Sequence, residues 1–203
     1  MSVHKAGSDT DIAEGKRRSA ADRLCETATN LFYQRGIRAV GVDEIVTETG
    51  VTKPTLYRSY ASKDDLIVVC LQKQIADSQA RWEAVAARYP DDALAELKAH
   101  FTDFAEEIGL PDYRGCASTN AAVEFPDPRH PARAITDDCK AFMRQRMGDL
   151  IRRLPVKDAQ GLADGLMLLL EGASSSRHTS GSQGPSSTLV QTSNMLLAAY
   201  MAG

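Results

Sequence analysis

The sequence predicts an all-α protein of about nine helices. Apolar residues recur at three- and four-residue intervals along most of the chain, which is the spacing of a helix with one buried face. Glycines and prolines interrupt this spacing where helices are expected to end. No segment alternates apolar and polar residues with the period of two of a half-buried strand. We expect a disordered arm (residues 1–15), a three-helix head (residues 16–62) and a helical body (residues 63–203).

The composition is that of an ordinary globular chain, with 43% hydrophobic and 25% charged residues. No apolar run approaches the ~18 residues of a membrane span, and the first residues lack the apolar stretch of a signal peptide. We therefore expect a cytoplasmic protein without a membrane partner. The cysteines are Cys25, Cys70, Cys116 and Cys139. They form no C-x-x-C pair and fit a reducing compartment as small apolar side chains, while Cys116, in a polar stretch, is a candidate redox switch.

The charge differs between the two ends of the chain. The net charge is −3, yet residues 1–63 carry ten Lys and Arg against eight Asp and Glu, a balance of +2. The remainder carries fourteen against nineteen, a balance of −5. A mildly basic first third on an acidic remainder fits a protein that places one end against a phosphate backbone.

The first helix of the head is expected to open at Lys16 and to end at Gly36. Its opening residues, Lys16, Arg17 and Arg18, have two interpretations. They are either a solvated helix start or a contact with phosphate beside a DNA groove.

The stretch Val42 to Lys63, VDEIVTETGVTKPTLYRSYASK, predicts two short helices joined by a tight turn. Gly50 ends the first, because glycine tolerates the positive φ that closes a helix. Thr52 is expected to cap the second, with Pro54 in its first turn, where the missing N–H costs nothing. Helices of about two turns are unstable alone, so they must pack on the rest of the head and leave one face outward.

The second of these helices presents donors and aromatic rings rather than an apolar stripe. They are Lys53, Thr55, Tyr57, Arg58 and Tyr60. This arrangement is typical of a helix-turn-helix that enters a DNA major groove, so we predict double-stranded DNA as a partner, with Thr52 at the start of the helix as a further contact. The alternative is a solvated helix face.

The body is expected to begin with a long helix, capped by Ser62 with Asp65 and ended by Pro90. Asp91 or Asp92 is expected to cap the next one. Helices are predicted over residues 93–109, 116–125, 132–154, 158–173 and 186–201. Residues 174–187, rich in Ser and Gly, are expected to form a flexible loop.

Three motifs carry a resemblance to a known family: ATNLFYQRGIRAVGVDEIV (residues 28–46), ETGVTKPTLYRSY (residues 48–60) and ASKDDLI (residues 61–67). Over about residues 17–70 the chain resembles the TetR family of transcriptional regulators. The segment RGCASTNAAVEFPDPRHPA (residues 114–132) also resembles a recurrent element of one branch of that family.

The resemblance implies roles for single residues of the head. The family's phosphate-binding positions are matched by Lys53, Tyr57 and Lys63. Thr55 and Arg58 match positions that face base edges, where arginine pairs bidentately with guanine. Tyr60 matches an aromatic residue that packs its ring inward, and its hydroxyl is expected to point outward. Two residues depart from the family pattern: Ser59 replaces a frequent histidine and Val40 a frequent threonine, which leaves Gly41 as a helix cap.

The resemblance also implies a body that binds a small molecule and forms a homodimer through helices 158–173 and 186–201. Both helices carry more apolar surface than a lone helix covers, and small residues permit close approach at Gly161, Gly165, Gly172 and Ala173. One helix-turn-helix reads only a few base pairs, so pairing gives adequate specificity. The alternative is that these helices are internal core.

Large, pliable side chains in the body suit a cavity for a largely apolar effector. They are Trp82, Phe101, Phe104, Phe125, Phe142, Met143 and Met167. Asn120 and Glu124 are candidates for the polar groups that orient it. Core packing is the alternative for each aromatic residue, and a surface position is the alternative for Glu124.

The function predicted is therefore a repressor that a small, largely apolar ligand releases from a palindromic operator. A dimeric DNA-binding protein without a ligand is one alternative. An enzyme is another, but Ser175, Ser176 and His178 lie in no strand–turn–helix elbow. No glycine-rich phosphate loop and no metal-binding histidine spacing occurs, so we expect no cofactor and no metal.

Overall fold

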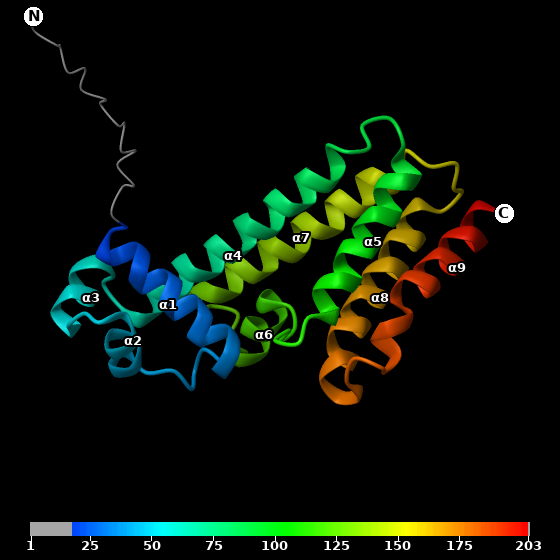
Figure 1. The fold of residues 1–203 in the computed structure, drawn as a ribbon. Helices are drawn as coiled ribbons and strands as arrows, with labels where there is room; N and C mark the ends of the chain where they lie inside the picture. The colour runs from blue at the N-terminus through cyan, green and yellow to red at the C-terminus, as the bar shows by residue number, and fades with distance from the viewer. Residues whose placement is uncertain (1–17, 203) are drawn as a thin grey trace, which may run out of the picture.

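The computed structural model describes residues 18–202, which form nine α-helices, one 3₁₀ segment and no strand. The predicted arm, Lys16 and Arg17 lie outside this range. Three helices gather at one end of the molecule, α4 (Lys63–Ala86) and α7 (Pro131–Ile151) run side by side through the middle, and α5 (Ala93–Gly109), α8 (Ala159–Ser180) and α9 (Leu189–Met201) lie together at the other end (Figure 1). The all-α prediction is confirmed.

The head contains α1 (Ala20–Arg35), α2 (Val42–Thr49) and α3 (Lys53–Ser59). Ser19 caps α1, because its hydroxyl accepts the N–H of Asp22 while the Asp22 carboxylate accepts the N–H of Ser19. Gly50 ends α2 with a φ of 69°, in the left-handed region that its position predicts.

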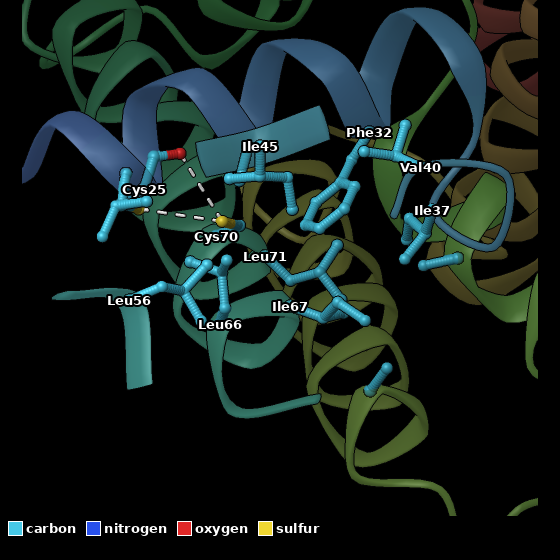
Figure 2. Close-up of a cluster of buried hydrophobic side chains, with 14 of the residues drawn as sticks. Cys25, Phe32, Ile37, Val40, Ile45, Leu56, Leu66, Ile67, Cys70 and Leu71 are labelled. Carbon is cyan, nitrogen blue, oxygen red and sulfur yellow. Dashed lines mark hydrogen bonds between the residues drawn. The ribbon is translucent and has the colours of Figure 1, made fainter. Parts of the chain in front are cut away.

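One cluster of buried apolar side chains connects the head helices to the first turns of α4, and Figure 2 shows it. Its labelled members are Cys25, Phe32, Ile37, Val40, Ile45, Leu56, Leu66, Ile67, Cys70 and Leu71. Two of them face each other, with the sulfur atoms of Cys25 and Cys70 3.8 Å apart. The cluster also includes Ala121 and Ala132 from the body, so it continues across the expected boundary at residues 62/63.

The body contains α4 (Lys63–Ala86), α5 (Ala93–Gly109), α6 (Ala117–Glu124), α7 (Pro131–Ile151), α8 (Ala159–Ser180), a 3₁₀ segment (Pro185–Thr188) and α9 (Leu189–Met201). Ser62 caps α4 and Asp92 caps α5, each by accepting a backbone N–H three residues on. The helix α4 ends at Ala86, before the predicted Pro90, because residues 87–92 form turns.

The predicted flexible loop over residues 174–187 is wrong in its first half, since α8 continues to Ser180. Contacts with distant residues stabilise these two extra turns. The Arg177 guanidinium donates to the carbonyl oxygens of Ile108 and Leu110, at the C-terminal end of α5, at 3.1 Å and 3.2 Å. Cations are favoured at a helix C-terminus, so a polar sequence is helical here.

A second apolar cluster occupies the far half of the body. Its buried members come from α4, α5, α7, α8 and α9 and include Trp82, Phe101, Met147, Leu162 and Leu166. Within residues 18–202 no helix is both long enough and apolar enough to cross a membrane.

Candidate nucleic-acid interface and body cavities

The helix α3 presents a polar face to solvent while its one fully buried residue, Leu56, anchors it in the head. Lys53, Tyr57 and Arg58 are exposed, and half of the Tyr57 surface is accessible, which is unusual for a large aromatic side chain. These three side chains provide an ammonium, a phenol and a guanidinium on one short helix. All three groups donate hydrogen bonds of the kind that phosphates and base edges accept.

Two local contacts order the start of this face. Lys53 forms an exposed ion pair of 2.7 Å with Asp43 of α2, and the hydrogen bond that its ammonium donates to Asp43 raises the pKa of Lys53. Thr52 occupies the cap position of α3, but its hydroxyl lies 3.0 Å from that of Thr55 and accepts no backbone N–H. The predicted side-chain cap is therefore wrong, and the two hydroxyl groups bind each other at the surface instead.

Tyr60 and Lys63 are directed inward, unlike the other predicted DNA contacts. The Tyr60 hydroxyl donates to the carbonyl oxygen of Ala21 at 2.9 Å, and burial raises its pKa to about 12. The expectation that this hydroxyl points outward is wrong, although its ring packs on the head cluster as expected. The Lys63 ammonium donates to the carbonyl oxygen of Ile37 at 2.8 Å and lies 5.7 Å from the Phe32 ring centre, and burial lowers its pKa.

The two departures from the family pattern have simple structural outcomes. Val40 is 1% exposed and belongs to the head cluster, so an apolar residue suits this position. Gly41 is the cap residue of α2 and, having no side chain, makes no side-chain cap. Ser59 is exposed and its hydroxyl donates to the carbonyl oxygen of Thr55 at 3.2 Å.

A cavity of about 340 Å³, the inner cavity, lies in the body. Its walls come from α4, α5, α7, α8, the segment that joins α5 to α6, Tyr33 of α1 and the first residues of α6. The apolar wall residues include Leu71, Ile75, Phe104, Ile108, Met143, Met167 and Leu170. The volume lies within the ~300–1,000 Å³ of small-molecule sites.

Three of the predicted ligand contacts line this cavity: Phe104, Met143 and Met167. Four others lie outside the walls of this cavity and of the pocket described below: Trp82, Phe101, Phe125 and Phe142. Trp82 stacks on the His100 ring with centres 3.6 Å apart, and Phe125 stacks on the His130 ring at 3.9 Å. The ring partners of Trp82 and Phe125 are protein side chains, and none of the four residues lines either space, so we do not propose them as ligand contacts.

Polar groups that the sequence did not single out also line the inner cavity. Lys140 of α7 pairs with Glu171 of α8, and its ammonium lies 3.5 Å from the Cys116 sulfur. Tyr113 donates to the Ser174 hydroxyl at 2.9 Å, and burial raises the pKa of Tyr113. Glu171 had a detectable signal, because it is a lone carboxylate within the apolar run GLMLLLEGA.

Asn120 and Glu124 lie elsewhere, in a pocket of about 460 Å³ between the head and the body, here called the outer pocket. The Glu124 carboxylate accepts the backbone N–H groups of Ile37 and Arg38 at 3.0 Å and 2.7 Å. The Asn120 amide donates to the carbonyl oxygen of Arg114 at 2.7 Å. Glu124 therefore connects α6 to the segment between α1 and α2, a role that its apolar neighbours in sequence did not predict.

The outer faces of α8 and α9 expose large apolar side chains. Leu168 is 74% exposed and Met195 is 65% exposed. Gly172 lies on the same helix as Leu168, and a Cβ added there would meet no neighbouring atom within 4 Å, whereas one added at Gly165 would meet Leu196 of α9. The glycines therefore serve two purposes, close packing between α8 and α9 at Gly165 and an open face at Gly172.

Comparison with known proteins supports the resemblance seen in the motifs. Residues 24–70 match the model of the bacterial regulatory proteins of the tetR family. The HTH-type transcriptional activator FasR of Mycolicibacterium smegmatis is 36% identical over 87 residues, 41% of this chain and 39% of that protein. The HTH-type transcriptional repressor ComR of Escherichia coli is 26% identical over 166 residues, 75% of this chain and 77% of that protein. The alignment thus spans about two fifths of the first relative.

Solved structures extend the similarity to the whole described fold. SCO4454, a TetR-family transcriptional regulator from Streptomyces coelicolor, is 30% identical, covers 90% of this chain and 96% of its own, and superposes with a TM-score of 0.85. A putative TetR-type regulator from Streptomyces avermitilis is 28% identical with a TM-score of 0.72, over 90% of this chain and 98% of its own. The chain therefore belongs to the TetR family of transcriptional regulators, which are DNA-binding proteins and not enzymes.

Proposed function

We propose that this protein works as a homodimeric repressor that leaves a palindromic operator when a small, largely apolar molecule enters its body. The exposed donors of α3 support the assignment of the reading surface. Lys53 and Tyr57 are assigned to phosphates, and Thr55 and Arg58 to base edges, as in a recognition helix within a major groove. Lys63 is assigned to a smaller role at the phosphate backbone, because its ammonium already binds Ile37.

The apolar face of α8 and α9 supports dimerisation. Leu168 and Met195 expose surface that a monomer would leave in water, and Gly172 leaves room for a partner's side chain. Two copies joined through this face carry two heads. Half-sites about 34 Å apart on one side of the duplex would then be read together.

The observation that carries the ligand proposal is the position of Leu71 of α4. Leu71 is 3% exposed, belongs to the apolar cluster of the head and also lines the inner cavity. A molecule in that cavity therefore contacts a side chain that packs against the DNA-reading part. For release, this molecule must bind the DNA-incompetent arrangement more tightly, because equal affinity for both states shifts nothing.

The first test is selection of bound DNA from a random pool, in which a palindromic site should be enriched. Compounds that raise the melting temperature of the protein are then added to the complex, and DNA release is followed by fluorescence anisotropy. The variant Met167→Trp fills the inner cavity and should retain DNA binding but lose the response. Val69→Trp, at an exposed position of α4 outside the cavity walls, is the control.

The outcomes separate the alternatives. Release that is equal in the wild type and in Met167→Trp would reject the inner cavity as the effector site. A panel in which no compound raises the melting temperature favours a dimeric DNA-binding protein without a ligand. A reporter gene under the selected operator then distinguishes repression from activation, since the similar proteins include one of each kind.

A further inference from the structure

The inner cavity and the outer pocket adjoin each other. Tyr33, Leu71, Gln74 and Ala117 line both. The Tyr33 hydroxyl donates to the Gly115 carbonyl oxygen at 3.1 Å and accepts the Arg114 N–H at 2.9 Å, which fixes its ring beside the shared wall. An elongated molecule that packs against this ring would place one part in each space.

The inner cavity disfavours an anionic group. Its walls carry four carboxylates and two cations: Asp77, Glu107, Asp112, Glu171, Arg81 and Lys140. Arg81 pairs with Glu107 and Lys140 with Glu171. Within residues 18–202 Asp77 and Asp112 have no ion-pair partner, so the remaining charge is negative and the rest of the wall is largely apolar.

The outer pocket has the opposite balance. Arg35, Arg114 and His178 line it against one carboxylate, Glu124, which two backbone N–H groups already bind. Arg35 pairs with Glu44 outside the pocket. In the described part of the chain no carboxylate pairs with the exposed Arg114. Arg114 is therefore the cation that remains for a ligand in the outer pocket.

We propose that the effector is an amphipathic anion, whose apolar part fills the inner cavity and whose carboxylate or phosphate lies in the outer pocket beside Arg114. This inference rests on the proposed function, because it names the chemistry of the same effector site. The opposite charges of the two spaces orient the molecule. Only one direction places the anion near a free cation and the apolar part among apolar side chains.

This orientation also explains how a ligand would act on the head. An anion in the outer pocket lies in the same space as the Glu124 carboxylate, and like charges at close range repel each other. Repulsion weakens the contact of Glu124 with Ile37 and Arg38, which connects α6 to the head. Because coupling is reciprocal, DNA binding should weaken the anion's affinity by the factor by which the anion weakens DNA binding.

The test uses three probes with the same ten-carbon chain and different ends: decanoate, decanol and decyltrimethylammonium. Calorimetry on the full chain should show decanoate binding tightest. Its affinity should fall about tenfold in Arg114→Gln, since charge-assisted hydrogen bonds are worth about 1.5 kcal/mol or more. Arg88→Gln, which removes an exposed arginine beyond the end of α4, should bind decanoate as the wild type does. Each methylene from octanoate to decanoate should tighten binding about fourfold.

A second variant tests the placement across both spaces. Ala117→Leu adds a side chain to the shared wall and should abolish decanoate binding while the melting temperature stays near that of the wild type. The proposal of an anionic effector would be overturned if decanol or decyltrimethylammonium bound more tightly than decanoate. It would also be overturned if Arg114→Gln and Arg88→Gln lost the same affinity for decanoate. Either result would leave the inner cavity as an effector site. The proposal of an anionic effector would also fail if decanoate did not bind at all. The proposed function is tested separately, by the wider panel of compounds that are screened for a rise in melting temperature.

Discussion

Glu124 and Ile37 are 87 positions apart in the sequence, yet the Glu124 carboxylate accepts the Ile37 backbone N–H at 3.0 Å. Its second oxygen accepts the N–H of Arg38 at 2.7 Å, and the Lys63 ammonium donates to the carbonyl oxygen of Ile37. The segment between α1 and α2 is therefore bound through both polar groups of the Ile37 backbone. This contact is the most direct polar connection between α6 and the head.

Glu124→Gln removes one of the two acceptors and brings an amide N–H toward a backbone N–H. We expect the free energy of unfolding to fall by about 1–3 kcal/mol, the cost of leaving a partly buried donor without an acceptor. Urea denaturation measures it. Glu106→Gln, at an exposed position of α5, is the control and should change stability little. Equal stability of the two variants would show that the connection contributes nothing.

Substitutions on α3 should separate two kinds of DNA contact. Arg58→Ala should relax base preference at one position of the half-site, by roughly 1–3 kcal/mol. Lys53→Gln should weaken binding to all sequences and reduce the slope of log affinity against log salt by about one. Anisotropy titrations on selected and scrambled DNA at several salt concentrations measure both effects. A uniform loss with Arg58→Ala would reassign that residue to phosphate.

Lys63→Gln should behave differently from Lys53→Gln, because the Lys63 ammonium binds the Ile37 carbonyl oxygen at 2.8 Å. We expect it to lower the stability of the head as well as DNA affinity. Thermal denaturation without DNA distinguishes the two positions. A stable Lys63→Gln variant with a changed salt slope would return Lys63 to the phosphate contacts that the family resemblance implies.

Leu168→Glu should separate the dimer. Burying a leucine at an interface contributes about 1.5–3 kcal/mol, and a buried unpaired carboxylate opposes association further. Sedimentation velocity should show a shift to monomer, together with loss of affinity for a two-half-site DNA. Val69→Glu, at an exposed apolar position on α4, is the control and should leave the dimer intact. If Leu168→Glu stays dimeric, α8 does not form the interface.

His100 should make stability depend on pH. Burial is the main cause that lowers its pKa from 6.5 to about 4, and Arg146 and Arg88 add to the effect. Between these two pH values the unfolded chain binds a proton that the folded chain does not, so stability decreases as the pH falls from 6.5 to 4. The loss is at most about 3–4 kcal/mol, from ~1.4 kcal/mol per pH unit over the range from 6.5 to about 4. As the pH decreases from 6.5 to 4, the melting temperature of the wild type should fall relative to that of His100→Phe, which keeps a ring against Trp82.

The sequence predicted the parts of this fold that short-range signals determine. Gly50, Ser62 and Asp92 end or begin helices through contacts within three or four residues, and the structure contains each of these contacts. The exposed face of α3 follows from the same local pattern. Contacts at long range were not predictable, and Arg177 illustrates this, since the carbonyl groups that stabilise its turn lie 69 and 67 positions away.

The cavity residues show a further limit. Apolar spacing predicts that a side chain is buried but not whether its neighbour is protein or empty space. Phe104 and Met143 line the inner cavity, whereas Phe101, three residues before Phe104, packs in the second apolar cluster at 2% exposed. Glu124 was expected to face a ligand, yet its partners are backbone groups of the head that no pattern around α6 reveals.

The buried thiols of Cys25 and Cys70 can be used to measure how often the head opens. Both thiols are almost inaccessible, and burial raises the pKa of Cys70 to about 12, so alkylating reagents reach them only when α1 separates from α4. Cys116 and Cys139 line the inner cavity and are partly exposed. The rate at which iodoacetamide modifies Cys25 and Cys70 therefore reports how often the head opens. The same measurement with operator DNA bound, and then with a ligand bound, shows which of the two keeps the head closed.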